Sequence, residues 1–378
     1  MSISTCLAKI DTPFLFIDKA KFDANVFSLR AKLAPYDVVL RPHLKTVKSI
    51  EGARHVLADF NSPATVSTVK EAEVFADAGY TNLIYAVGIA PQKLPRIHAL
   101  LNQGVNISIL LDSVSQAKAV TEYCQTHNIK IPTLLEIDCD GHRGGIQPDD
   151  IRLIEIATIL HQDGAEFRGV LTHAGESYDC NSEEALVAAA EGERFAAVSA
   201  ATQLIECGLP CPVVSVGSTP TAHFAKNLDG VTEVRAGVYT FFDLVMAGIG
   251  VCQYDDIALS VVTSVIGHNE DKDWLFIDAG WMSLSQDRGT ASQAKDCDYG
   301  LVCDIEGNII PGLQVITTNQ EHGIVASIDG GKLPDIMVGT QLRILPNHAC
   351  ATAAMHAGYY VGNSDQVELD YWQRIQGW

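Results

Sequence analysis

The sequence predicts an α/β protein in which a (β/α)8 TIM-type barrel is followed by a mostly antiparallel β domain. Two observations support this fold class. Eight short β-rich runs alternate with helical stretches between about Tyr36 and Tyr239, whereas after about Leu244 short β-runs follow one another with few helical stretches between them. We place the barrel domain at residues 12–244 and the β domain at residues 245–378 together with residues 1–11.

The eight barrel runs share the length and composition of buried strands. They are DVVLRPH, PATVST, NLIYAV, NISILLD, IPTLLEID, FRGVLTHAG, PVVSVGS and EVRAGVY. Amphipathic segments lie between them, and we expect Asp112 and Ser182 to be the N-caps of two helices. An open doubly wound sheet shows the same alternation. The count of eight favours the barrel, and the G-x-G-x-x-G signature of dinucleotide-binding sheets is missing.

The β domain is predicted from runs such as ALSVVTSVIGHN and GLQVITTNQEHGIVAS, which are bounded by Gly, Asn and Asp corners. The run PFLFID precedes the first barrel strand, and we expect it to pair with this second domain.

Composition narrows the classes of function. The chain has 378 residues, 47% of them apolar, and a formal net charge of −20, which disfavours nucleic acid and anionic membranes as partners. An anionic ligand therefore needs a locally positive pocket. No signal peptide or membrane-spanning run is apparent. The ten cysteines include no CxxC pair, which predicts reduced thiols in a cytoplasmic protein.

Polar residues follow the predicted barrel strands, where the chemistry of such barrels takes place. They are Lys45, Thr68, Asp112, Asp138, Arg143, His173, Tyr178, the corner Gly217–Thr221, Gly237 and Tyr239. Lys45, in RPHLKTVKS, comes just after the first strand, and a lysine in a partly dry pocket there can act as a nucleophile or base. The alternative is that Lys45 and Lys48 are both surface lysines. We expect Lys48 to lie on the following helix and face solvent.

The corner VGSTPT has two interpretations. Gly217 permits a close backbone approach, and Ser218, Thr219 and the following N–H groups can cradle a phosphate, with Gly237 and Tyr239 completing the cup. The alternative is an ordinary turn with an N-cap. His142 and Arg143 follow Asp138 in a glycine-rich loop, and His173 is placed where its imidazole can stack on a flat ring.

The segment PNHAC places His348 and Cys350 two residues apart at the end of a predicted strand. Alternation along a strand puts such residues on one side, so an imidazole and a thiolate can bind one metal ion, and this pair of donors suits zinc. His356 is a weaker candidate for a third ligand. A lone H-x-C pair also arises by chance.

Together TPFLFID, RPHLKTVKS, VGSTPT, EVRAGVY, DAGWMSLSQD and PNHAC resemble the D-serine dehydratase and D-threonine aldolase family across almost the whole chain. These pyridoxal phosphate enzymes have the alanine racemase-type barrel (fold type III). The resemblance implies that Lys45 bonds the cofactor and that Gly217, Ser218, Thr219, Gly237 and Tyr239 surround its phosphate. It also places Arg143, His173 and Tyr178 near the cofactor ring, and a divalent metal on His348 and Cys350. Arg41 and His43 are expected to support Lys45.

The resemblance further implies a homodimer with shared active sites and a lyase reaction on a small D-3-hydroxy amino acid. We rank dehydration to a 2-oxo acid and ammonia first, because dehydratases of this family tend to have Cys as the second metal ligand. The alternatives are an aldolase, which breaks the Cα–Cβ bond, an amino acid racemase, and a pyridoxal phosphate binding protein without turnover. The β domain argues against the last of these.

Overall fold

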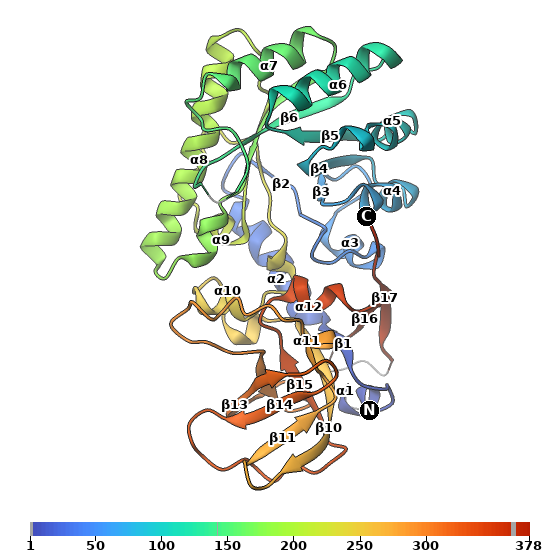
Figure 1. Cartoon of the computed structure of the whole chain (residues 1–378), viewed down its shortest axis with the longest axis vertical. Coiled ribbons are helices and arrows are strands. Elements are labelled where there is room, and N and C mark those ends of the chain that lie inside the picture. Colours follow the sequence, from blue (N-terminus) through green and yellow to red (C-terminus); the bar gives the residue numbers. More distant parts are fainter. Residues whose placement is uncertain (1–2, 142, 364–367) are drawn as a thin grey trace. The chain divides into compact units, whose positions relative to one another are not determined.

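The computed structural model describes residues 3–141, 143–363 and 368–378. The chain forms two compact units, which are described separately (Figure 1). The barrel unit comprises Ser28–Gly237 and Ile375–Trp378, and the antiparallel unit comprises Met1–Phe27 and Val238–Arg374.

The barrel unit contains eight parallel strands. They are β2 (Val39–Leu40), β3 (Ala64–Val66), β4 (Asn82–Gly88), β5 (Asn106–Leu111), β6 (Pro132–Ile137), β7 (Glu166–Thr172), β8 (Val213–Val216) and β9 (Glu233–Val234). From β3 onward each pairs with the next along the chain, and β2 pairs with β9. A parallel bridge between His43 and Thr65 joins the β2 segment to β3 and closes the ring. The predicted barrel is therefore confirmed, and each of the eight runs contains one strand.

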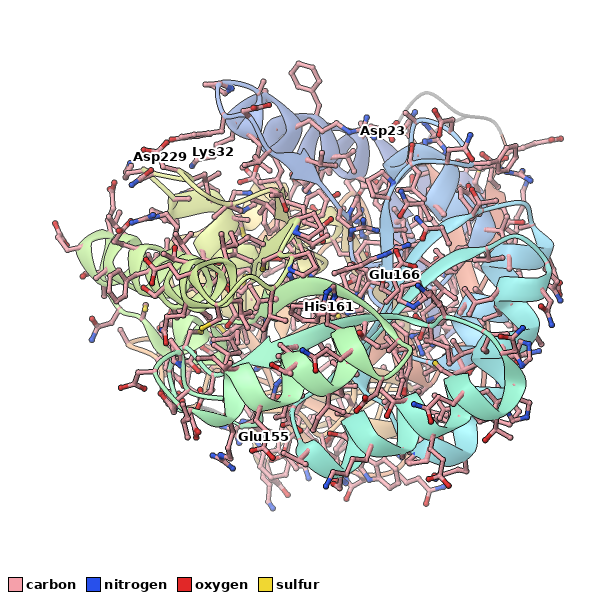
Figure 2. All side chains as sticks on the ribbon, turned by 90° about the horizontal axis from the view of Figure 1, so that it is seen from above. Asp23, Lys32, Glu155, His161, Glu166 and Asp229 are labelled. Atoms are coloured by element: carbon pink, nitrogen blue, oxygen red, sulfur yellow. The ribbon has the colours of Figure 1, made fainter. Side chains whose placement is uncertain are left out.

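Helices connect the barrel strands. They are α3 (Ile50–Val56), α4 (Val69–Asp77), α5 (Leu94–Asn102), α6 (Val114–His127), α7 (Arg152–Gln162), α8 (Glu183–Glu206) and α9 (Thr219–Phe224), with the short helices η1 (Pro91–Lys93) and η2 (Gly175–Asp179). Figure 2 shows one connection, in which α7 carries Glu155 and His161 and leads to Glu166 at the start of β7. The helix α2 (Lys19–Leu33) spans the boundary between the units.

Hydroxyl groups start several of these helices. The side chain of Ser182 caps α8 as expected, by accepting a hydrogen bond from the N–H of Ala185. The expectation for Asp112 is wrong, because Ser113 caps α6. The carboxylate of Asp112 instead accepts from the N–H of Gly145, in the loop after β6.

The antiparallel unit is built on a nine-stranded sheet in the order β11-β14-β13-β12-β15-β10-β1-β16-β17. Because β11 also pairs with β10, six of these strands close into a second barrel. The strands are β1 (Phe14–Asp18), β10 (Leu259–Asn269), β11 (Trp274–Ile277), β12 (Leu301–Cys303), β13 (Ile309–Thr318), β14 (Gly323–Ser327), β15 (Gln341–Leu345), β16 (Gly358–Gly362) and β17 (Asp370–Gln373).

Short helices complete this unit. They are α1 (Ile3–Leu7), α10 (Leu244–Gly248), α11 (Trp281–Leu284) and α12 (Ala349–Ala354), with the one-turn helices η3 (Val238–Thr240) and η4 (Tyr254–Asp256). Strand β1 pairs antiparallel with β10 and parallel with β16, which confirms that the run PFLFID joins the second sheet. Phe14 and Phe16 of this strand pack with Leu7 and Val262 in a buried cluster.

The compact units differ at their ends from the expected domain bounds. Residues 12–27 and 238–244, which we grouped with the barrel, lie in the antiparallel unit. The pairing of β1 with β10 and β16 explains why the N-terminal residues belong there. Among the described residues, no helix is long and apolar enough to cross a membrane.

Candidate active site

Lys45 lies in a tight turn that follows β2. The turn is attached to both neighbouring strands, because the N–H of His43 donates to Ala236 at 2.7 Å and that of Leu44 donates to Thr65 at 2.8 Å. Leu44 and Val47 are buried, whereas Lys45 is exposed. The turn therefore anchors its apolar residues in the barrel and leaves Lys45 exposed to solvent.

The surroundings of Lys45 are locally positive. Burial, together with the positive charges of Lys45, Arg143 and Arg235, lowers the pKa of His173 to about 3. Burial and the charges of Lys45 and Arg235 likewise lower the pKa of His43 well below its usual value. Both imidazoles are therefore neutral at pH 7. In a chain with a net charge of −20, Lys45, Arg143 and Arg235 form a local group of positive charges of the kind that an anionic ligand requires.

The orientation of His173 is set by a backbone carbonyl. Its Nδ1 lies 2.9 Å from the oxygen of Gly217. A carbonyl oxygen only accepts hydrogen bonds, so in the neutral ring Nδ1 carries the proton and Nε2 is the acceptor. The ring of Tyr178 lies 6.1 Å away, centroid to centroid, and is tilted by 47°. The structure thus brings these two predicted residues together.

The corner Gly217–Thr221 forms a capping box. The N–H of Ser218 donates to Thr221 Oγ1 and the N–H of Thr221 donates to Ser218 Oγ. The N–H of Gly217 donates to the carboxylate of Glu193 at 3.0 Å. The alternative of a turn with an N-cap therefore holds, and two of the backbone donors that we assigned to a phosphate already have protein partners.

Close packing between strands explains the two glycines that we singled out. At Gly217, which has φ +143°, a Cβ atom would lie 1.9 Å from the oxygen of Arg235. At Gly237 it would lie 2.9 Å from Thr46 Oγ1 and 3.1 Å from the oxygen of His43. Gly217 thus allows β8 to approach β9, and Gly237 allows the chain to pass beside the Lys45 turn.

We expect Gly217→Ala to destabilise the protein severely, because its methyl group has no room against the backbone of Arg235. Thermal unfolding should show a midpoint lowered by roughly ten degrees or more, or no folded protein. Gly208→Ala is the matched control. Gly208 has φ +80°, but no other atom lies within 4 Å of the position that a Cβ would take, so this substitution carries only the backbone cost. Equal midpoints for the two variants would contradict this account.

Three charged residues of this region were not singled out from the sequence. Arg235 is buried and donates to Ser215 Oγ and to the oxygen of Thr172, next to His173. Burial lowers its pKa to about 10. Ser215 also donates to Glu233, which pairs with Arg41 at 2.7 Å. Arg41 therefore belongs to this buried network, while His43 contacts the N–H of Lys45 through Nδ1 at 3.4 Å.

Glu193 is the third such residue, and it links two loops of the barrel. This buried carboxylate on α8 accepts hydrogen bonds from the N–H groups of Ala174 and Gly217 and from Thr221 Oγ1. It lies in an alanine-rich helix and precedes Gly217 by 24 residues. The one sequence signal for this role is the placement of a glutamate on the face of α8 that is otherwise apolar and buried.

Arg143 lies in the loop after β6 and remains 57% exposed at its side chain, 3.9 Å from Glu136. His142 lies outside the described residues. Lys48 differs from our expectation: it precedes α3, for which Ser49 is the N-cap, and it pairs with Glu71. Tyr239 is buried in the antiparallel unit, whereas Gly237 belongs to the barrel unit.

The second candidate site lies in the antiparallel unit. Strand β15 ends at Leu345, and His348 is the N-cap of α12, so strand alternation was the wrong reason to pair His348 with Cys350. The first turn of a short helix nevertheless brings them together. His348 Nδ1 lies 2.6 Å from Asp287 Oδ2, and the side chain of Cys350 hydrogen-bonds the imidazole.

The negative charges around His348 and Cys350 favour a bound cation. Burial acts to lower the pKa of His348, but the hydrogen bonds to Asp287 and Cys350 and the nearby negative charges raise it to about 11. The hydrogen bond to His348 lowers the pKa of Asp287. An Asp that holds one ring nitrogen leaves the other to bind a metal, an arrangement common at metal sites. Asp287 is the partner that sequence analysis missed.

His356, the other candidate ligand, contacts a backbone carbonyl. His356 Nε2 lies 3.0 Å from the oxygen of Ser283. Among residues 3–141, 143–363 and 368–378, no cluster of three or more His, Cys, Asp or Glu side chains could hold a metal.

Comparison with known proteins identifies the family. The family model for the alanine racemase N-terminal domain matches residues 17–245, and that for a putative serine dehydratase domain matches residues 258–362. D-threo-3-hydroxyaspartate dehydratase from Delftia sp. is 48% identical, over 98% of this chain and 99% of that protein. The chain belongs to the D-serine dehydratase and D-threonine aldolase-like family. The expected resemblance is thereby confirmed.

Other members of this alanine racemase-like family support the assignment. A D-threonine aldolase from Arthrobacter sp. is 30% identical, over 97% of this chain and 93% of that protein. A solved alanine racemase-like protein from Idiomarina loihiensis is 51% identical with a TM-score of 0.95, and the match covers 98% of this chain and 99% of that one. The Delftia dehydratase, with a TM-score of 0.96, has also been solved as a cysteine-to-alanine variant in a metal-free form.

Proposed function

We propose that this protein is a pyridoxal phosphate and metal dependent dehydratase of D-3-hydroxy amino acids, with D-threo-3-hydroxyaspartate and D-serine as the first substrates to test. The observation that carries the proposal is the Asp287–His348–Cys350 group, in a chain that is 48% identical to a D-threo-3-hydroxyaspartate dehydratase and presents Lys45 at its barrel. The net reaction converts the substrate to a 2-oxo acid and ammonia.

All the residues assigned to the cofactor except Tyr239 belong to the barrel unit. When bound, pyridoxal phosphate acts as an electron sink that makes the Cα proton of the substrate acidic. Lys45 is assigned the covalent bond to the cofactor and, once released from it, the role of base for that proton. Lys45, Arg143 and Arg235 attract the anionic groups of cofactor and substrate. Neutral His173 presents a flat ring without adding another positive charge.

The antiparallel unit supplies the residues for the metal. A divalent ion, when bound, acts as a Lewis acid on the β-hydroxyl group of the substrate and helps it leave. His348 and Cys350 are assigned as the ligands, and Asp287 orients the imidazole by accepting from Nδ1. A thiolate and an imidazole favour zinc. Elemental analysis of protein purified without added metal tests that choice, and a metal other than zinc would reject it.

A substrate panel tests the reaction class. Purified protein loaded with pyridoxal phosphate should release a 2-oxo acid and ammonia from D-threo-3-hydroxyaspartate or D-serine, and nothing from the L-enantiomers. Release of glycine together with an aldehyde or aldehyde acid would instead make the protein an aldolase. This alternative is tested because the chain is 30% identical to a D-threonine aldolase. Interconversion of D- and L-amino acids without either product would favour a racemase.

We assign the phosphate of the cofactor to Gly217, Ser218, Thr219, Gly237 and Tyr239. Gly217 is unsuitable for testing it, because any side chain there clashes with Arg235. Thr219→Val removes a hydroxyl group while keeping the shape of the side chain. The dissociation constant of pyridoxal phosphate should rise in this variant, whereas an unchanged constant would argue against Thr219.

We propose a homodimer with shared active sites, which sedimentation equilibrium would test by giving twice the mass of the 40.7 kDa chain. A cytoplasmic location is in keeping with the cysteines, none of which forms a disulfide in the structure. Fractionation of cells that express the protein would check it.

A further inference from the structure

The turn that carries Lys45 contains a second lysine in an unusual environment. The Nζ of Lys48 lies 2.9 Å from Glu71 Oε1, and the side chains are 18% and 0% exposed, respectively. The same carboxylate accepts hydrogen bonds from the N–H and hydroxyl of Ser67 and from the hydroxyl of Thr68. A fully buried carboxylate needs such partners, and Lys48 is the cation placed against it.

The backbone of Lys48 is also constrained. Its φ of 44° lies in the left-handed region, which a residue other than glycine seldom adopts unless its surroundings hold it there. Its N–H donates to the oxygen of Leu44 at 2.7 Å, which closes the turn around Lys45. Its own oxygen accepts from the N–H of Ile375 at 2.6 Å, within the same unit.

These contacts hold the turn on three sides. The strands bind its start through His43 and Leu44, Glu71 on α4 binds the side chain at its end, and Ile375 binds the backbone there. Lys45 is the exposed residue in the middle. A change at Lys48 therefore acts on Lys45 through the backbone of the turn and not through a contact with the Lys45 amine.

We propose that Lys48 is a positioning residue: its ion pair with buried Glu71 holds the left-handed backbone of Lys48 at the end of the turn and thereby fixes the Lys45 amine for its bond to the cofactor. The inference rests on the proposed function, because it requires Lys45 to be the lysine that bonds pyridoxal phosphate. A purely structural brace would instead affect the stability of the fold and leave the cofactor bond unchanged.

The experiment compares variants at both ends of the ion pair. Lys48→Met and Lys48→Asn remove the charge, and Asn tolerates the left-handed backbone. Lys48→Arg retains the charge, and Glu71→Gln removes its partner. Glu73→Gln is the matched control, because Glu73 lies on the same helix but pairs with Arg96 at 2.7 Å. Each protein is saturated with pyridoxal phosphate. One portion is fixed with borohydride, and in another the cofactor release rate is followed by visible absorbance.

We expect Lys48→Met, Lys48→Asn and Glu71→Gln to release the cofactor about tenfold faster than the unaltered protein, and to fix less of it on Lys45. Lys48→Arg should restore most of the retention, and Glu73→Gln should match the unaltered protein. The value of kcat should fall more than KM rises. The double variant Lys48→Met/Glu71→Gln leaves no unpaired buried carboxylate, so it should fold while still releasing the cofactor rapidly.

Other outcomes would overturn the inference. Unaltered release and fixation in Lys48→Asn and in the double variant, with only a lower unfolding temperature, would make the ion pair a structural brace. Slow release in Lys48→Asn but rapid release in Lys48→Met would assign the effect to the backbone rather than to the ion pair. Fixation on a lysine other than Lys45 in the unaltered protein would reject the proposed function, and the inference with it.

Discussion

Lys45→Ala is expected to abolish turnover and to leave the protein without covalently fixed cofactor. The substitution removes both the amine that bonds pyridoxal phosphate and the base assigned to the Cα proton. Loss of a general base alone costs about 10²–10⁴-fold in rate. After borohydride treatment, peptide mapping should find the cofactor on Lys45 in the unaltered protein and on no residue in the variant.

Two controls make this result specific. Lys70→Ala removes an exposed lysine on α4 and should leave both cofactor fixation and turnover unchanged. Lys45→Arg retains a positive charge near His173 but has no amine that can bond the cofactor. If Lys45→Arg or Lys45→Ala still carried fixed cofactor and turned over substrate, the assignment of Lys45 would be wrong.

Loss of the metal is expected to have the second large effect. Removal by a chelator, His348→Ala or Cys350→Ala should each eliminate dehydration of D-3-hydroxy substrates, because only two protein ligands are assigned to the ion. The visible absorbance of the cofactor should persist, since it arises from the bond to Lys45, which is not a ligand of the metal. Metal content, absorbance and 2-oxo acid formation are measured on the same samples.

The matched variants separate the ligands from their surroundings. Asp287→Asn should weaken metal binding by about 10–100-fold, because it removes the carboxylate that orients His348. Cys180→Ala replaces another half-buried cysteine, in the barrel unit, and should leave metal content unchanged. Dehydration that survives verified removal of the metal would refute the role of the ion. Loss of the cofactor absorbance on metal removal would show that cofactor binding depends on the metal, against our expectation.

The barrel could be predicted because its strand order follows the sequence. Each β-rich run lies beside the next, so counting eight runs was sufficient to predict the closed ring. Lys45 could be placed for the same reason, since it follows the first of these runs. The second sheet was predicted as a class, but no such rule fixes its order, in which β1 lies between β10 and β16.

The residues that contact the candidate site residues were much harder to predict from the sequence. His348 and Cys350 are near neighbours in the sequence and form a motif, whereas Asp287 precedes His348 by 61 residues. Glu193 and Gly217 are 24 residues apart, and no periodic pattern links them. The contacts of Lys48 and Asp112 were also predicted wrongly, although they involve nearby residues. The helix after each of them begins later in the sequence than we expected, so each side chain contacts a different partner.

Local pattern by itself determined the alternation of strands and helices, the apolar faces that they bury, and the few polar residues at strand ends. These follow from side-chain periodicity, which each segment carries independently of the others. Only the tertiary structure decided that Gly217 must be glycine against Arg235, that Glu193 ties two loops, and that Lys48 meets Glu71. Such contacts depend on buried polar groups finding partners, and those partners come from any segment that the fold brings within hydrogen-bonding distance.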